Sequence, residues 1–249
     1  MKAKDSAQEM RVAGDLVNRT GLAAESDASQ MRETAASFRP KGSVQQFRKY
    51  RQEVRRGMEP VGTMPPPASL TGVVRDAVRR LGGQKTTVLL DKLGERLAFE
   101  RTGTRLYETL LEKHADSGGF EGGPTRAQLE RFRDQEAAHF HMLHEKMLEL
   151  DGDPTAMTPS ADLAAVTSMG VVAVIADART NLAESLEAIL VAELADRDGW
   201  VRLIELAEQG GQDELARACR QAEREEEEHL ANVRSWLSAY AMAGAESTD

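Results

Sequence analysis

The sequence predicts an all-α protein whose main domain is an antiparallel four-helix bundle. Aromatic residues make up only 4% of the 249 residues, whereas β-sandwiches and β-barrels are rich in aromatic and β-branched side chains. Ala, Leu, Glu, Arg and Gln dominate instead, and these residues favour helices. Apolar residues also recur at helical spacing over four stretches of about 25–29 residues, each about 40 Å long as a helix.

The first two long helices are predicted at about 86–114 and from Thr125 to about 151. Leucines recur at helical spacing in the first, although Gly94 and Gly103 inside it lower its helix propensity. Thr125 is a residue type that caps helix N-termini, and an Asp-Gly-Asp-Pro sequence ends the second helix. Short loops between long helices favour an antiparallel bundle.

Two more long helices are predicted at about 180–208 and 213–241, on either side of a Gly-Gly pair. The connection before them takes about 30 residues, enough to run the length of the bundle, so the third long helix is expected to lie parallel to the second. This connection carries a short extra helix at about 161–178. Its apolar run, 163–176, is too short to span a bilayer, and we interpret it as a buried helix.

Residues 1–80 are predicted to form a poorly packed N-terminal arm, and residues 81–249 the bundle domain. The arm holds a Pro-rich linker at 60–67 and is expected to hold short amphipathic helices, for example at 44–57. It carries 15 Lys and Arg against nine Asp and Glu, a net charge of +6, whereas the remainder carries 17 against 32, a net charge of −15. This acidic body disfavours nucleic acid as a ligand and suits cations.

The single cysteine, Cys219, excludes a disulfide within the chain and any site built from several cysteine ligands. The first ten residues lack the apolar core of a signal peptide. With no transmembrane segment predicted, we expect a cytoplasmic protein.

Two Glu-x-x-His motifs, Glu136 to His139 and Glu226 to His229, lie in the second and fourth long helices. Residues at i and i+3 share a helix face, so each motif presents one oxygen and one nitrogen to the same point. Either motif alone is more often a solvated helix face, and a run of four glutamates at 225–228 produces the second by composition.

Two glutamates in apolar stretches of the other helices change that interpretation. Glu100 lies 36 residues before Glu136, and Glu193 lies 33 residues before Glu226, so each pair is expected at a similar height in the bundle. A carboxylate in an apolar stripe is costly unless it is paired or metal-bound. One Glu from each of two helices and Glu-x-x-His from each of two others is a di-metal pattern of helix bundles. Without metal, we expect the pKa values of these carboxylates to be raised.

This pattern resembles that of the ferritin-like superfamily of di-iron carboxylate proteins, which includes bacterioferritins and rubrerythrins. The resemblance covers about residues 86–241 and rests on Glu100, Glu136, His139, Glu193, Glu226 and His229. It implies two bound iron ions, or manganese in their place. It further implies that Glu136 and Glu226 bridge the metals, that Glu100 and Glu193 are terminal ligands, and that each histidine binds one metal.

Tyr107 lies seven residues after Glu100, and bacterioferritin-like proteins carry a tyrosine at that offset. The resemblance implies that it hydrogen-bonds a ligand or donates an electron. Trp200 is its counterpart seven residues after Glu193, and the alternative is that both aromatic side chains simply pack the core.

Two acidic residues leave the ligand set open. Asp196 lies three residues after Glu193, and in rubrerythrin-like proteins an extra carboxylate on this helix favours peroxide chemistry. Glu225 could replace Glu226 as the partner of His229, although the spacing of 33 residues favours Glu226.

Two departures from the family pattern reduce the number of functions that the resemblance implies. The chain lacks the Cys-x-x-Cys pairs of a rubredoxin module. A bundle that ends near residue 241 leaves no room for the short fifth helix of ferritins, which disfavours a 24-subunit storage shell.

Three functions follow from the resemblance. The first is a homo-oligomeric ferroxidase or peroxidase-type oxidoreductase of oxidative stress, which oxidises Fe(II) with O2 or peroxide, or reduces peroxide with an unknown electron donor. The second is an iron-storage oligomer. The third is a non-enzymatic stress or scaffold protein that acts through the N-terminal arm.

Overall fold

The computed structural model describes residues 25–38, 42–58 and 84–246, and the chain falls into two compact units, 1–58 and 59–249. In the first unit the described helices are α2 (Glu25–Ser37) and α3 (Val44–Arg56). The hydroxyl oxygen of Ser43 accepts a hydrogen bond from the Gln46 backbone N–H at 3.1 Å and caps α3. α3 has no buried residue and lies at the amphipathic stretch that the sequence predicts.

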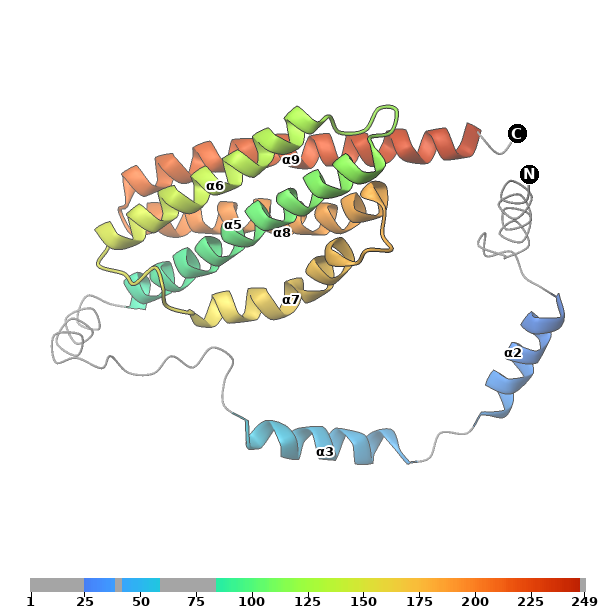
Figure 1. The fold of residues 1–249 in the computed structure, drawn as a ribbon. Helices are drawn as coiled ribbons and strands as arrows, with labels where there is room; N and C mark the ends of the chain where they lie inside the picture. The colour runs from blue at the N-terminus through green and yellow to red at the C-terminus, as the bar shows by residue number, and fades with distance from the viewer. Residues whose placement is uncertain (1–24, 39–41, 59–83, 247–249) are drawn as a thin grey trace. The chain divides into compact units, whose positions relative to one another are not determined.

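The second unit holds five described helices: α5 (Gln84–Ser117), α6 (Arg126–Glu149), α7 (Pro159–Ala176), α8 (Leu182–Gln209) and α9 (Asp213–Glu246). The four long ones, α5, α6, α8 and α9, form the predicted bundle. α5 packs against α6, and α8 packs against α9 (Figure 1). The two pairs meet through contacts of α5 with α8 and of α6 with α9. α6 and α8 run in the same direction, as the long connection between them predicts. The predicted all-α fold class, an antiparallel four-helix bundle with a long connection between the second and third long helices, is therefore confirmed.

Capping residues set where the helices begin. Thr125 and Asn181 each form a capping box, in which the cap side chain and the side chain three residues later bond each other's backbone N–H. Thr158 caps α7, which begins with a proline. α5 and α9 each contain 34 residues, more than the sequence predicts.

The two glycines inside α5 mark places where the helix lies against other groups. A Cβ added at Gly94 would lie 2.3 Å from the side chain of Thr158, the N-cap of α7. A Cβ added at Gly103 would lie 2.1 Å from Oε2 of Glu136 on α6. These glycines lower helix propensity but allow α5 to approach α6 and the loop before α7.

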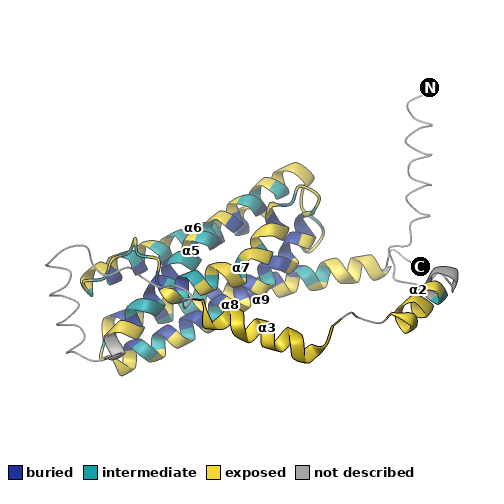
Figure 2. Ribbon diagram, turned by 90° about the horizontal axis from the view of Figure 1, so that it is seen from below, coloured by how far each residue is buried: buried dark blue, intermediate teal, exposed yellow. Residues whose placement is uncertain are grey.

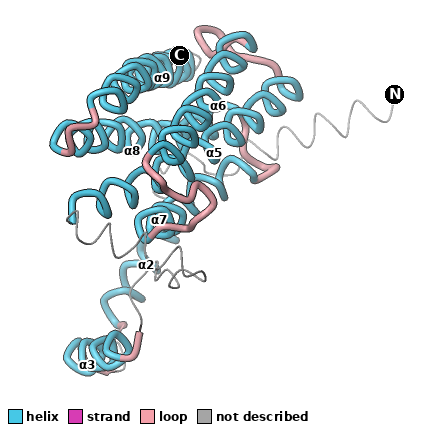
Figure 3. The backbone as a smooth tube through the Cα atoms, turned by 90° about the vertical axis from the view of Figure 1, so that its left-hand side faces the viewer, coloured by secondary structure: helices cyan, strands magenta, loops and turns pink. Residues whose placement is uncertain are grey.

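The prediction that α7 is a buried helix is wrong. Only Ala161 and Ile175 are buried, and the side chains of Leu163, Val166 and Met169 are more than half exposed (Figure 2). α7 packs on α5 and α8 outside the four long helices (Figure 3). Because those helices already fill the core, α7 covers them with one side only. Among the described residues it is the one helix long and apolar enough, by length and composition, to cross a membrane.

The core of the bundle consists of two apolar clusters along its axis. One includes Tyr107, Phe132 and Leu186, and the other includes Leu93 and Leu203. On each long helix the predicted metal-binding residues lie between the segments that form these two clusters. A charged layer is thus enclosed between two apolar ones.

Candidate metal centre

The six residues predicted as ligands come together in this charged layer. α5 supplies one Glu, α8 supplies one Glu, and α6 and α9 each supply a Glu-x-x-His pair. All six are buried: Glu100, Glu136, His139, Glu193, Glu226 and His229. The predicted heights in the bundle are therefore correct.

Their ligand atoms fall into two overlapping groups. Glu100, His139 and Glu226 offer atoms within 4.8 Å of one another, and so do Glu136, Glu193, Glu226 and His229. We refer to these groups as the Glu100–His139 half and the Glu193–His229 half of the centre. Glu226 belongs to both halves.

Each of the six residues holds a buried atom without a hydrogen bond to any residue that the structure describes. These atoms are Oε2 of Glu100, Glu136 and Glu193, both carboxylate oxygens of Glu226, and Nδ1 of His139 and His229. Nδ1 of His139 lies 2.9 Å from Oε1 of Glu226, yet the two atoms are not aligned as a hydrogen bond. A buried polar atom left unpaired costs about 1–3 kcal/mol, so a cluster of them fits bound cations. Four carboxylates and two imidazoles suit two divalent ions such as Fe²⁺ or Mn²⁺.

The outer nitrogen of each histidine contacts the residue that precedes a ligand on the facing helix. Nε2 of His139 lies 2.8 Å from Oε2 of Glu225, and Nε2 of His229 lies 3.0 Å from Oε1 of Gln135. Both partner atoms are acceptors, so Nε2 donates the proton and the lone pair of neutral imidazole lies on Nδ1, toward the centre. Glu225 therefore lies outside the centre, and Glu226 lies within it.

Each terminal glutamate has one oxygen engaged and one left free. Oε1 of Glu193 accepts a hydrogen bond from the Tyr107 hydroxyl at 2.5 Å. Oε1 of Glu100 accepts one from Nη2 of Arg96. In both residues Oε2 is the free atom, which favours ligation through a single oxygen. Tyr107 thus contacts a predicted ligand across the bundle, while the indole Nε1 of Trp200 forms no hydrogen bond within the described part of the chain.

Arg96 is a buried side chain that the sequence analysis missed. Its guanidinium forms an ion pair with Asp196 and lies over the rings of Phe99 and Trp200, at 4.6 and 5.2 Å. Asp196, considered as an extra ligand, is thus ion-paired with a cation from the chain itself, although neither of its buried oxygens accepts an aligned hydrogen bond from a described residue. A charged residue four positions before Glu100, within an apolar stripe, was the available signal.

The metal-free protein distributes protons unevenly over the carboxylates. Burial and the Glu226 charge raise the pKa of Glu136 well above its ordinary value and that of Glu193 to about 8. Burial also opposes ionisation of Glu226, but the two histidines outweigh it and lower its pKa to about 2. The expectation of raised values throughout is wrong for Glu226, because both imidazoles converge on this one carboxylate.

The same contacts protonate the histidines. Burial lowers the pKa of His139, but the Glu100 and Glu226 carboxylates outweigh it and raise the value to about 11. Burial likewise opposes protonation of His229, while Glu136 and Glu226 raise its pKa to about 10. Metal binding must therefore displace these protons.

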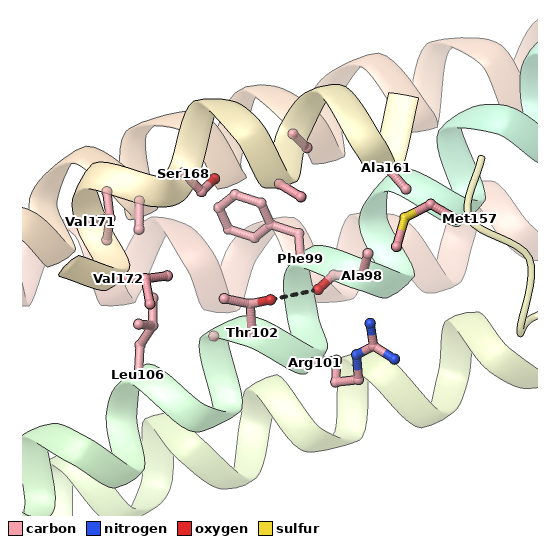
Figure 4. Close-up of a pocket in the computed structure, with 14 residues that line it drawn as sticks. Ala98, Phe99, Arg101, Thr102, Leu106, Met157, Ala161, Ser168, Val171 and Val172 are labelled. Atoms are coloured by element: carbon pink, nitrogen blue, oxygen red, sulfur yellow. Dashed lines mark hydrogen bonds between the residues drawn. The ribbon is translucent and has the colours of Figure 1, made fainter. Parts of the chain in front are cut away.

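An apolar pocket of about 170 Å³ lies between α5 and α7 (Figure 4). Phe99, Val171 and Val172 line it, and the Thr102 hydroxyl in its wall donates to the backbone oxygen of Ala98 at 2.9 Å. Gly103 also lines it and is the residue whose added Cβ would meet Glu136. Gly103 therefore lies between the pocket and the Glu136 carboxylate.

The chain is similar to proteins of known fold. The family model described as ferritin-like domain matches residues 91–243. A solved structure of ferritin like, diiron-carboxylate proteins from Bacillus anthracis str. Ames is 19% identical, with a TM-score of 0.47, covering 62% of this chain and 99% of that one. Dps from Thermosynechococcus elongatus is 19% identical, with a TM-score of 0.45, covering 61% and 92%. No curated protein matches the chain.

Proposed function

The chain belongs to the ferritin-like domain family, and we propose that it is a di-iron carboxylate protein that oxidises Fe(II) with O2 or peroxide, or reduces peroxide. The observation that carries this proposal is the set of buried, unpaired oxygen and nitrogen atoms that all six candidate ligands turn toward one region. These atoms have no hydrogen-bond partner among the described residues, and a cluster of this composition suits two iron ions, or manganese in their place.

In this proposal the ligands divide as the family resemblance implies. Glu136 and Glu226 would lie between the two metal positions, Glu100 and Glu193 would each bind one metal through Oε2, and each histidine would bind through Nδ1. This assignment is supported by Glu226, which is common to both halves of the centre, and by Glu136, which approaches Glu226 and Glu100 in a further group of carboxylates. Bound iron would supply Lewis acidity and electrons.

The chain's own residues would hold the ligands and exclude water. Tyr107 keeps its proton, because burial and the Glu193 and Glu136 carboxylates raise its pKa well above 10. Its hydroxyl fixes Oε1 of Glu193 and leaves Oε2 available. The apolar clusters on either side keep bulk water from the charged layer. The pocket lined by Phe99 and Gly103 would be the side from which a small uncharged oxidant approaches the centre.

We place the activity in residues 81–249, with residues 1–80 as an arm, and we propose a cytoplasmic homo-oligomer. The electron donor would be a separate protein or small molecule, since the one cysteine of the chain, Cys219, is buried in the core.

Anaerobic loading of the purified protein with Fe(II), followed by metal analysis, tests the proposal. We expect about two irons per chain, as the six-ligand set requires, and loss of both in Glu136→Ala. Addition of O2 or peroxide should then oxidise the iron, followed by absorbance. Many more irons per chain would favour storage, and no bound iron would favour a scaffold that acts through its arm.

A further inference from the structure

Arg96 is a cation that the chain builds into the metal centre. All buried Asp, Glu and Arg side chains among the described residues belong to this centre, and Arg96 is the single arginine among them. It pairs with Glu100 on its own helix and with Asp196 on α8. Burial of a guanidinium is tolerated only where such partners compensate its lost hydration.

The surrounding residues shape a place for the guanidinium. A Cβ added at Gly199 on α8 would lie 2.3 Å from Nη1 of Arg96, so glycine leaves the space that the guanidinium fills. The rings of Phe99 and Trp200 lie at cation–π distance from it.

The other half of the centre has no such pair. Four residues before Glu193, the position equivalent to Arg96 is Ile189. Three residues after Glu100, the position equivalent to Asp196 is Gly103. The ion pair is therefore an addition to the Glu100–His139 half and not part of the repeated ligand pattern.

The charges show what the pair contributes. Glu100, Glu136, Asp196 and Glu226 offer oxygens within 4.8 Å of one another, a third buried group with the composition of a cation site. With neutral histidines, the five buried carboxylates and Arg96 leave four negative charges, the number that two divalent ions balance. Loss of Arg96 would leave five negative charges, and loss of Asp196 would leave three.

We propose that Arg96 is a positioning residue that takes the place of a third cation in the centre. It occupies Asp196, so that this carboxylate does not bind metal, it holds Oε1 of Glu100, and it matches the charge of the centre to two divalent ions. This inference rests on the proposed function, because it assumes metal at the six ligands.

Anaerobic Co(II) titration of the full chain, with binding isotherms and bound metal measured per chain, tests this role. Asp196→Asn should weaken Co(II) binding by at least about tenfold, since it removes a negative charge that lies within 4.8 Å of oxygens of Glu100, Glu136 and Glu226. Arg96→Gln should bind an additional equivalent of Co(II), because Asp196 and Oε1 of Glu100 become free. The double variant Arg96→Gln/Asp196→Asn restores the wild-type charge and should bind two equivalents with near wild-type affinity.

The double variant separates charge from packing. If the pair only fills space, the double variant will bind Co(II) as weakly as Asp196→Asn or more weakly, and the inference is overturned. Unchanged affinity and stoichiometry in both single variants overturn it as well. If the wild type binds no Co(II), both the proposed function and this inference fail. If the wild type and every variant bind two equivalents, only the inference about Arg96 is contradicted.

Arg96→Lys provides a check should Arg96→Gln not fold. It keeps a positive charge in the space beside Gly199, so the chain should still bind two equivalents of Co(II). An additional equivalent in this variant would show that charge at this position does not limit the centre, and would refute the inference. Circular dichroism of each variant verifies that the helices are retained.

Discussion

The two halves of the metal centre present the same ligands but support them differently. In the Glu193–His229 half, a neutral phenol, Tyr107, holds the terminal glutamate, and an amide, Gln135, holds the histidine. In the Glu100–His139 half, Arg96, which is itself paired with Asp196, holds the glutamate, and a carboxylate, Glu225, holds the histidine. The repeated helix pairs thus determine the geometry of the candidate ligands, whereas the groups behind these ligands would make two metal positions inequivalent.

Glu226 is the residue that both halves share, so its substitution should have the largest effect. Glu226→Gln removes the charge to which both histidines are paired, and we expect less than about 0.2 metal per chain where the wild type holds about two. The matched control is Glu225→Gln, which alters only the outer partner of His139 and should weaken one metal position by about tenfold. Equal metal loss in both variants would contradict the division between inner and outer glutamates.

Substitution of one histidine should remove one half and spare the other. His139→Ala and His229→Ala should each retain about one metal per chain, because the remaining half keeps its own imidazole and the shared carboxylates. Metal analysis after anaerobic loading measures this, and calorimetry of the metal-free variants should show little loss of stability. Loss of both metals in either variant would mean that the halves do not bind independently.

Two glycine substitutions should affect different halves. Gly103→Ala forces a Cβ against the Glu136 carboxylate and should destabilise the protein by about 1–3 kcal/mol and weaken metal binding. Gly199→Ala forces a Cβ against the Arg96 side chain and should mainly disturb the Glu100–His139 half. Thermal unfolding and Co(II) spectra of the two variants check this. Gly170→Ala, where an added Cβ meets no atom within 4 Å, is the control.

The metal-free and metal-loaded proteins should respond to pH in opposite ways. The pKa values of His139 and His229 are raised to about 11 and 10 from 6.5, so the stability that they contribute is full below pH 6.5 and is lost as the pH rises through 10 to 11. The pKa of Glu193 is raised to about 8 from 4.5, so further stability is lost as the pH rises from 4.5 to 8. The metal-free protein should therefore become easier to unfold as the pH rises from 6 to 10.

Metal affinity should instead increase over the same range, because binding displaces the histidine protons. Denaturant titrations with and without Co(II) measure both trends. A metal-free stability that increases with pH in this range would show that the buried histidines are not paired as described.

Removal of one hydroxyl should give the smallest effect. Tyr107→Phe leaves Oε1 of Glu193 without its donor and should cost about 1 kcal/mol in stability. Metal stoichiometry should stay at about two, while the affinity of the Glu193–His229 half and the rate of iron oxidation decrease. An unchanged rate of iron oxidation would show that Tyr107 only packs the core.

Much of the fold and of the candidate site follows from local sequence patterns. Apolar periodicity located the long helices, and capping residues such as Thr125 and Asn181 set their starts, because helix formation depends on neighbours three and four positions apart. Spacings of 36 and 33 residues placed Glu100 level with Glu136, and Glu193 level with Glu226, because rise per residue and loop length determine height in a bundle.

Only the tertiary structure decided which groups lie behind the ligands and which helix faces solvent. Arg96 meets Asp196 across 100 positions of sequence, and His139 meets Glu225 across 86; side-chain direction and packing between helices determine such contacts. The same holds for α7, whose apolar composition indicated burial although the long helices left it only one face to cover. Helical periodicity acts within a segment, whereas charge pairing and burial depend on all the segments that meet at one place.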